Sequence, residues 1–98
     1  MYVLALIRYR RPVEEVLRHT DAHRAYLQEL KAKGLLLCSG PLEPRHGGAA
    51  LLRVADGDDL WARLDAIRDG DPYVRAGVAQ YELLPWAVAT GREDLERL

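Results

Sequence analysis

His23 is the residue whose type and position first indicate chemistry. It belongs to an apolar series, Val16, Thr20, His23, Leu27 and Leu30, whose alternating steps of four and three residues mark one face of a helix. A histidine on that face points to the interior or to a pocket. Because imidazole changes its charge near neutral pH, such a histidine can act as an acid, a base or a ligand. A packed histidine with one hydrogen bond fits the same pattern, so the helix alone leaves both interpretations open.

The other histidines carry weaker patterns. His19 precedes His23 by one helical turn, a spacing that can hold a metal ion, but Thr20-Asp21 stands where the zinc-protease motif has its glutamate, so we expect no metal site. His46 lies beside Gly47-Gly48, which lacks the lysine of a phosphate-binding loop. We therefore expect this segment to be a flexible loop that could act as a lid.

A basic cluster follows the first apolar run. The residues are Arg8, Tyr9, Arg10 and Arg11. They could attract an anionic substrate at the mouth of a pocket, or form a solvated strand edge that discourages further pairing.

Composition sets the class of protein. The 98 residues are 49% hydrophobic, and Lys+Arg 14 against Asp+Glu 15 give a net charge of -1. This predicts one small domain over residues 1–98, without the basic stripe that nucleic acid requires. The N-terminal apolar run is too short for a signal peptide or a membrane span. The one cysteine, Cys38, lies in an apolar run, which predicts a core position and a cytoplasmic protein.

These side chains must be positioned by six main elements, which the pattern predicts in the order strand, helix, strand, strand, helix, strand. Pro12 suits a helix start and Gly34 a helix end. The turn at residues 56–58 offers a carboxylate as a cap for the second helix, and Thr90 to Glu93 has the spacing of a capping box for a short C-terminal helix. The expected ranges are strands over 2–9, 35–38, 49–54 and 78–84, and helices over 12–33 and about 60–69, with a turn at Ser39-Gly40-Pro41 and a loop through residues 44–48.

This order predicts an α+β fold, the ferredoxin-like βαββαβ arrangement, with a four-stranded antiparallel sheet and helices on one face. The first strand should be central. Because the first two strands are apolar on both faces, the uncovered face requires a second cover. We expect a homodimer in which two such sheets pack face to face about a two-fold axis.

Four segments carry a resemblance to a known family. They are residues 23–27 (HRAYL), 34–42 (GLLLCSGPL), 71–78 (DPYVRAGV) and 84–86 (LPW). In this order they resemble the YciI-like (YCII-related) family, and only about the last dozen residues fall outside the match. The resemblance implies a dimeric α+β barrel similar to muconolactone isomerases.

The resemblance also implies a site. In that family the helix histidine and the aspartate of the Asp-Pro-Tyr segment are regarded as a His-Asp pair beside a cavity, and these roles fall on His23 and Asp71. A carboxylate bonded to one imidazole nitrogen fixes the tautomer and makes the other nitrogen a better base. Asp71 is equally well placed to cap a short helix that begins at Pro72, so both roles stay open.

Four further residues are expected to bind substrate. Ser39 could hydrogen-bond a substrate oxygen, although a plain turn serine fits as well, and no nucleophile elbow surrounds it. Gly40 and Pro41 should shape the turn beside it. Tyr73 could donate a hydrogen bond or a stacking face, against the alternative of an aromatic core residue.

Two classes of function follow from the resemblance. One is a cofactor-independent enzyme in which His23 moves a proton on a cyclic or aromatic substrate, with isomerase, lyase or dehalogenase-type chemistry. The other is a module that holds a small metabolite in the same pocket without turnover. A third reading, in which the dimer serves only as an interaction platform, predicts that His23 matters for stability alone.

Overall fold

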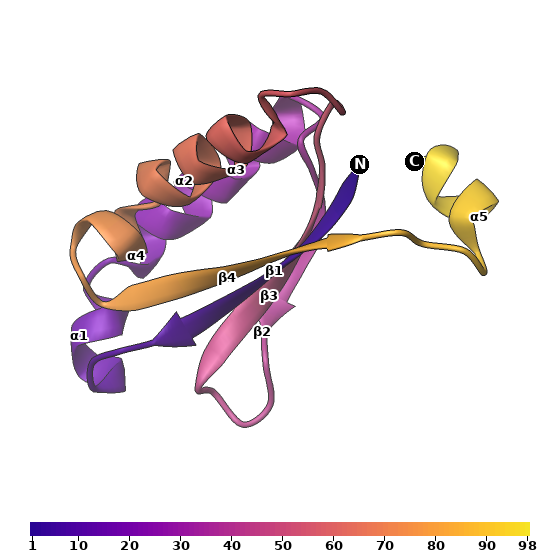
Figure 1. The fold of residues 1–98 in the computed structure, drawn as a ribbon. Coiled ribbons are helices and arrows are strands. Elements are labelled where there is room, and N and C mark those ends of the chain that lie inside the picture. The colour runs from indigo at the N-terminus through magenta and orange to yellow at the C-terminus, as the bar shows by residue number, and fades with distance from the viewer.

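The computed structural model describes residues 1–98 as one sheet with helices on one of its faces (Figure 1). The strands pair in the order β2-β3-β1-β4, and every neighbouring pair is antiparallel. This confirms the predicted α+β class and the central first strand. The elements are β1 (Tyr2–Tyr9), α1 (Val13–Leu17), α2 (Thr20–Ala32), β2 (Leu36–Pro41), β3 (Gly47–Arg53), α3 (Leu60–Gly70), α4 (Pro72–Arg75), β4 (Ala79–Trp86) and α5 (Arg92–Glu96).

Strand β1 shows how the sheet divides its side chains between two faces. Val3, Ala5 and Ile7 alternate along it and are buried. Ala5 lies opposite Ala50 of β3 and Leu83 of β4, so these residues share the face that the helices cover. The main core gathers there, between the sheet and helices α2 and α3. Its members are Val3, Ala5, Leu30, Leu36, Ala50, Leu52, Val54, Leu64 and Ile67.

The helix predicted over residues 12–33 is instead two helices, α1 and α2. The N–H groups of Arg18 and His19 bond carbonyls only three residues back, which closes α1. The Val16 carbonyl accepts from the His19 N–H at 3.0 Å and from the Thr20 hydroxyl at 3.4 Å, whereas a continuous helix would give it to the Thr20 N–H. Helix α1 therefore lies at the end of the helical layer instead of continuing α2 (Figure 1).

Strand β2 departs from the prediction at both ends. Ser39, Gly40 and Pro41, expected to form a turn, belong to the strand and pair with β3. Proline is tolerated there because β2 is an edge strand. The register shifts between Leu36 and Cys38, and Cys38 is exposed. The expected core position of Cys38 was therefore wrong, since an edge strand with an irregular register leaves this side chain uncovered.

Gly47 and Gly48 were expected in a loop and instead begin β3. A Cβ atom at Gly47 would lie 1.9 Å from the carbonyl oxygen of Ile7, and one at Gly48 would lie 2.9 Å from that of Gly40. These contacts allow no side chain without movement of the backbone. The two glycines therefore allow the strands to approach closely. In the sequence alone the same Gly-Gly pair indicates a loop.

Two predicted helix caps are also absent. Helix α3 begins after Asp59 and has no side-chain cap, so neither carboxylate of the turn at residues 56–58 caps it; Asp59 itself binds Arg63 at 2.9 Å. Helix α5 begins after Gly91, at φ 84°, without a side-chain cap. The predicted capping box at residues 90–93 was therefore wrong.

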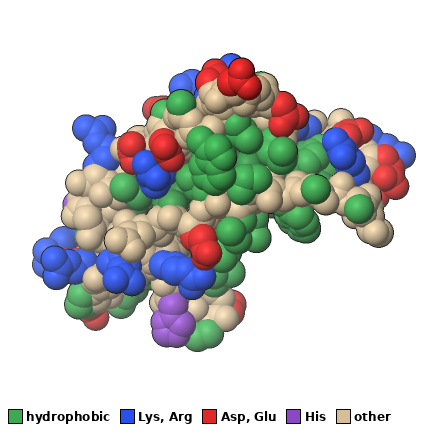
Figure 2. Space-filling model, in the orientation of Figure 1, with side chains coloured by type: hydrophobic (Ala, Val, Ile, Leu, Met, Phe, Trp, Pro, Cys, Tyr) green, Lys and Arg blue, Asp and Glu red, His purple; other side chains and the backbone are tan.

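Helices α1 to α4 leave the second face of the sheet uncovered (Figure 1). Helix α5 approaches only one end of that face, where Arg53 bonds the carbonyls of Leu95 and Leu98. The register places Leu4 and Leu6 of β1 and Leu51 of β3 on this face. Leu84 and Trp86 of β4 lie there too and are 38% and 48% exposed. Figure 2 shows hydrophobic side chains gathered across the middle of the molecule, with basic side chains towards the end that carries α1. No helix is both long enough and apolar enough to cross a membrane.

Candidate functional site

Asp71 lies where α3 gives way to α4, and its backbone dictates part of its role. The residue is extended, at φ -72° and ψ 126°, and Pro72 follows as the first residue of α4. The carboxylate accepts a hydrogen bond from the Tyr73 N–H at 2.9 Å. Asp71 is therefore the helix cap that its position before a proline predicted.

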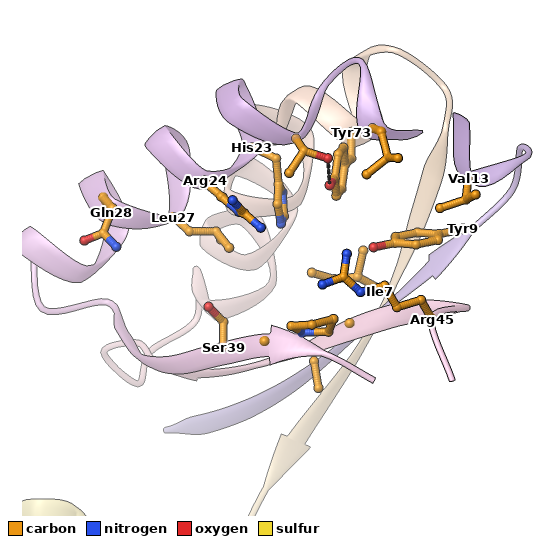
Figure 3. Close-up of a pocket in the computed structure, with 16 residues that line it drawn as sticks. Ile7, Tyr9, Val13, His23, Arg24, Leu27, Gln28, Ser39, Arg45 and Tyr73 are labelled. Atoms are coloured by element: carbon orange, nitrogen blue, oxygen red, sulfur yellow. Dashed lines mark hydrogen bonds between the residues drawn. The ribbon is translucent and has the colours of Figure 1, made fainter. Parts of the chain in front are cut away.

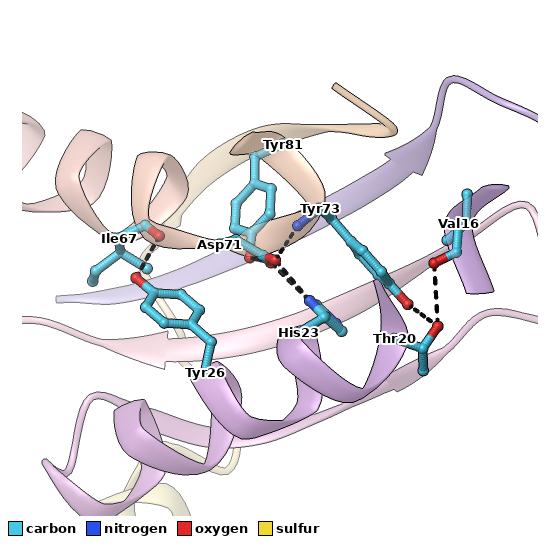
Figure 4. A network of polar contacts seen from close by, with 8 residues as sticks. All are labelled: Val16, Thr20, His23, Tyr26, Ile67, Asp71, Tyr73 and Tyr81. Carbon is cyan, nitrogen blue, oxygen red and sulfur yellow. Dashed lines mark hydrogen bonds and ion pairs between the residues drawn. The ribbon is translucent and has the colours of Figure 1, made fainter. Parts of the chain in front are cut away.

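The same carboxylate also contacts His23. Both carboxylate oxygens of Asp71 lie 2.9 Å from Nδ1 of His23, across 48 residues of sequence. The Tyr81 hydroxyl donates to the carboxylate as well. Asp71 has no exposed surface, so three donors replace the water that a buried carboxylate would otherwise lack. Capping and pairing are thus roles of one side chain and do not exclude each other (Figure 4).

This contact fixes the state of the His23 ring. A carboxylate that already receives N–H and O–H donors accepts and does not donate, so the proton lies on Nδ1 of His23. Nε2 has no hydrogen-bond partner within the chain, yet no buried polar side-chain atom lacks one. Nε2 is therefore accessible, on a side chain that is only 12% exposed. In the neutral ring Nε2 presents a lone pair.

Tyr73 holds the imidazole from the side. The two rings stack with their centroids 3.9 Å apart and their planes 9° from parallel. The Tyr73 hydroxyl lies 2.8 Å from Oγ1 of Thr20, whose own proton goes to the Val16 carbonyl. Thr20, which lies where α1 gives way to α2, thus also anchors the Tyr73 ring that stacks on His23.

Burial and the charge of Asp71 change the acidity of the surrounding phenols. The pKa of Tyr81 is raised strongly, first by burial and then by the negative charge and hydrogen bond of Asp71. Burial also raises the pKa of Tyr73 and of Tyr26, whose hydroxyl donates to the Ile67 carbonyl at 2.7 Å. These three hydroxyls stay protonated and act as donors.

A pocket of about 320 Å³ lies between α2, α1 and the sheet (Figure 3). This volume is at the small end of the range for ligand sites. The residues expected to bind substrate, Ser39, Gly40, Pro41 and Tyr73, all line it together with His23. Asp71 does not line it, since it lies behind the His23 ring. The remaining lining residues are Ile7, Tyr9, Val13, Leu17, Thr20, Arg24, Leu27, Gln28, Arg45, Gly48 and Ala49.

Some residues at the site escaped the sequence reasoning. Tyr81 is the third donor to Asp71, and the register places it opposite Ile7 on the helix-covered face. Its position in the alternation of β4 was the available signal. Arg24 and Arg45 line the pocket. Arg24 directly follows His23, but nothing in the sequence pattern brings Arg45 to that cavity.

Other candidates fall outside the pocket. Of the basic cluster only Tyr9 lines it, whereas Arg8 forms an exposed ion pair with Glu82 at 2.9 Å. His46 is exposed and His19 precedes α2, and neither lines the pocket. No group of three or more histidine, cysteine or acidic side chains is arranged to hold a metal ion.

Comparisons with known proteins agree with this architecture. A family model described as the YCII-related domain matches residues 1–87. Among solved structures the chain is similar to 5-chloro-2-hydroxyhydroquinone dehydrochlorinase from Burkholderia phenoliruptrix AC1100, solved in complex with 2,5-dihydroxybenzoquinone. The TM-score is 0.74 and the identity 21%, over 91% of this chain and 96% of that chain. No curated protein sequence matches significantly. At this identity the structural likeness shows a shared fold.

Proposed function

Since this chain belongs to the YCII-related family, we propose that it is a small-molecule enzyme in which His23 is the general acid and base and Asp71 orients it. One observation carries the proposal. A fully buried carboxylate binds Nδ1 of His23 and leaves Nε2 accessible on the side chain that lines the pocket. A histidine that served packing alone would need neither a buried charge behind it nor a cavity in front.

The chemistry that suits this arrangement is proton removal from a cyclic or aromatic substrate. Nε2 takes a proton from a ring carbon or hydroxyl, and the electron pair left behind forms a new double bond. In an isomerisation His23 returns the proton to another carbon; in an elimination a leaving group such as chloride departs with its electron pair. Neither reaction oxidises or reduces the substrate overall, so no redox cofactor is required.

The solved neighbour supports the elimination form of this proposal. Its name describes loss of hydrogen chloride from a ring compound, and its bound ligand is a dihydroxylated quinone. Ser39 and Tyr73 would then contact substrate oxygens, with Gly40 and Pro41 shaping the wall beside Ser39. All four lie on the pocket surface.

The test is a turnover screen with halogenated hydroquinones and small cyclic acids. His23→Ala should lower the rate of any substrate found by about 10²- to 10⁴-fold, because a positioned base is lost. His19→Ala is the matched control, one helical turn away and outside the pocket, and should keep the parent rate. If a compound binds, His23→Ala weakens its binding and no product forms, the protein is a metabolite-binding module. If His23→Ala changes only the stability of the protein, His23 has no role in turnover or in ligand binding.

We also propose that two copies pair through the uncovered faces of their sheets. That face carries Leu4, Leu6, Leu51 and the half-exposed Trp86, and a monomer would leave them in water. Sheet-on-sheet packing about a two-fold axis would cover them. We propose further that residues 1–98 form a single domain. The one free thiol suits a reducing compartment, so we propose that the protein is located in the cytoplasm.

Light scattering on two matched tryptophan variants tests the dimer. Trp86→Glu places a charge on the uncovered face and should yield monomers. Trp61→Glu changes a tryptophan of similar exposure on α3, 53% against 48%, and should leave the dimer intact. A parent protein that is monomeric at all accessible concentrations would contradict the proposal.

A further inference from the structure

The pocket has an unbalanced charge. Two arginines, Arg24 and Arg45, belong to its lining, and no aspartate or glutamate does. Neither guanidinium forms an ion pair or a hydrogen bond with the chain, whereas Arg8, Arg53 and Arg63 each do. Both arginines of the lining therefore keep all their N–H donors available.

These two arginines reach the cavity from different walls. Arg24 is on α2, directly after His23, and Arg45 is in the segment between β2 and β3. Figure 3 shows the Arg24 guanidinium beside the His23 ring and the Arg45 side chain in the space beneath it. An anionic group held there would lie beside the nitrogen that exchanges protons.

One wall of the pocket is aromatic and aliphatic. Tyr9 and Tyr73 meet edge to face, with their centroids 6.0 Å apart, and Ile7, Val13 and Leu17 extend this apolar wall. Aromatic and aliphatic side chains of this kind suit a flat ring. The small volume leaves room for a compound of about one ring.

From these observations we propose that the ligand is an anionic single-ring compound, with its ring against the tyrosines and its negatively charged oxygen on Arg24 and Arg45. This rests on the proposed function and names its substrate class. Guanidinium groups bind carboxylate or ionised ring oxygens through charge-assisted hydrogen bonds. The same two charges would stabilise an oxyanion that forms on the ring when His23 removes a proton.

Binding is tested without turnover, by titrating the protein with inert ring compounds while following the His23 ring signals by NMR. Benzoate carries a carboxylate, 4-nitrophenolate carries an ionised ring oxygen, and benzamide is a neutral compound of the same size as benzoate. We expect at least one of the anions to bind more tightly than benzamide and to weaken as salt is added. Which anion binds better distinguishes a carboxylate from a ring oxyanion.

Substitutions then locate the charge. Arg24→Gln and Arg45→Gln should each weaken anion binding by about tenfold or more, because a charge-assisted hydrogen bond is lost. Binding of benzamide should not change. Arg75→Gln is the control, since Arg75 is on α4 and does not line the pocket.

Three results would overturn the proposal: equal binding of benzoate, 4-nitrophenolate and benzamide, anion binding that survives in the double glutamine variant, or no binding of any of the three. The turnover screen separates this outcome from the fate of the proposed function. Conversion of a neutral ring compound in a His23-dependent reaction, without anion binding, would support the proposed enzyme and contradict the proposed anionic ligand. Anion binding through both arginines, with no turnover of any compound, would support the anionic ligand and contradict the proposed enzyme.

Discussion

At the scale of single residues, Asp71 links the fold to the candidate chemistry. Its carboxylate caps α4 through the Tyr73 N–H, accepts the Tyr81 hydroxyl and binds Nδ1 of His23. Each partner comes from a different part of the chain. A buried carboxylate is stable only when such donors surround it, so the residues that support the fold at this point also fix the orientation of His23.

Asp71→Asn should invert the His23 tautomer. The asparagine amide is close in shape, and its single oxygen can still accept from the Tyr73 N–H. Its NH₂ group then replaces the oxygen that accepts from Tyr81, so it faces the Tyr81 hydroxyl and Nδ1 as a donor. Nδ1 must then accept, so the proton moves to Nε2 and the lone pair leaves the pocket side. Nitrogen-15 NMR of the His23 ring measures this directly. An unchanged Nδ1–H tautomer in the variant would show that Asp71 does not determine the state of the ring.

The sequence predicted more of this site than of its surroundings. His23 followed from helix periodicity, and Asp71, Ser39 and Tyr73 followed from their positions beside Pro72 and Gly40 together with the family resemblance. The contact between His23 and Asp71 could not be deduced from their spacing, since only the packing of α2 against α4 closes 48 residues. Tyr81 and Arg45 were missed because their roles depend on register and loop path.

At the scale of elements, the structure differs from the prediction where backbone contacts outweigh local sequence signals. Residues 12–33 have helical periodicity throughout, yet the Val16 carbonyl accepts from the His19 N–H and the Thr20 hydroxyl instead of the Thr20 N–H, and the helix breaks. This break has a benefit for the site, because Val13 and Leu17 of α1 then line one end of the pocket. Side-chain competition for a backbone carbonyl is invisible in a hydrophobic pattern.

Glycine gives the second example, and a substitution can test it. Gly47→Ala would place a Cβ 1.9 Å from the Ile7 carbonyl oxygen, so β1 and β3 must separate, and we expect a loss of unfolding free energy of about 3 kcal/mol or more. Gly40→Ala is the control, because a Cβ there meets nothing within 4 Å. Urea denaturation of both variants measures the difference. Equal stability of the two would show that this close approach does not constrain the strands.

At the scale of the whole molecule, the order of elements was predictable and the environment of the edges was not. The apolar patterns and the turn residues between elements are enough to predict four strands and the order in which they alternate with the helical segments, but not the bounds of each element. Cys38 shows what this reasoning lacks. Its apolar neighbours indicate a core, but it lies on an edge strand, and strand order is a property of the assembled sheet.

Stability of the whole chain should fall in alkali. The pKa of Tyr81, and less strongly of Tyr26 and Tyr73, is raised in the folded state, whereas an unfolded tyrosine ionises near pH 10. Stability from these groups is therefore fully present below about pH 10. Above it the unfolded chain releases protons that the folded chain retains, and the unfolding free energy falls by up to about 1.4 kcal/mol per pH unit for Tyr81.

Urea denaturation at increasing pH measures that slope. Tyr81→Phe removes the group with the largest shift, so its stability should decline less steeply than that of the parent above about pH 10. Identical slopes in the two proteins would show that Tyr81 ionises alike in both states.

The position of the site along the chain has a consequence for how the protein can diversify. Every residue of the pocket and of the Asp71 network lies between Ile7 and Tyr81, and the segment after Trp86 contributes to neither. That segment is attached mainly through the buried Val88 and the bonds of Arg53 to its last carbonyls. Changes in the length or sequence of α5 therefore leave the walls of the pocket and the contacts of Asp71 unaltered.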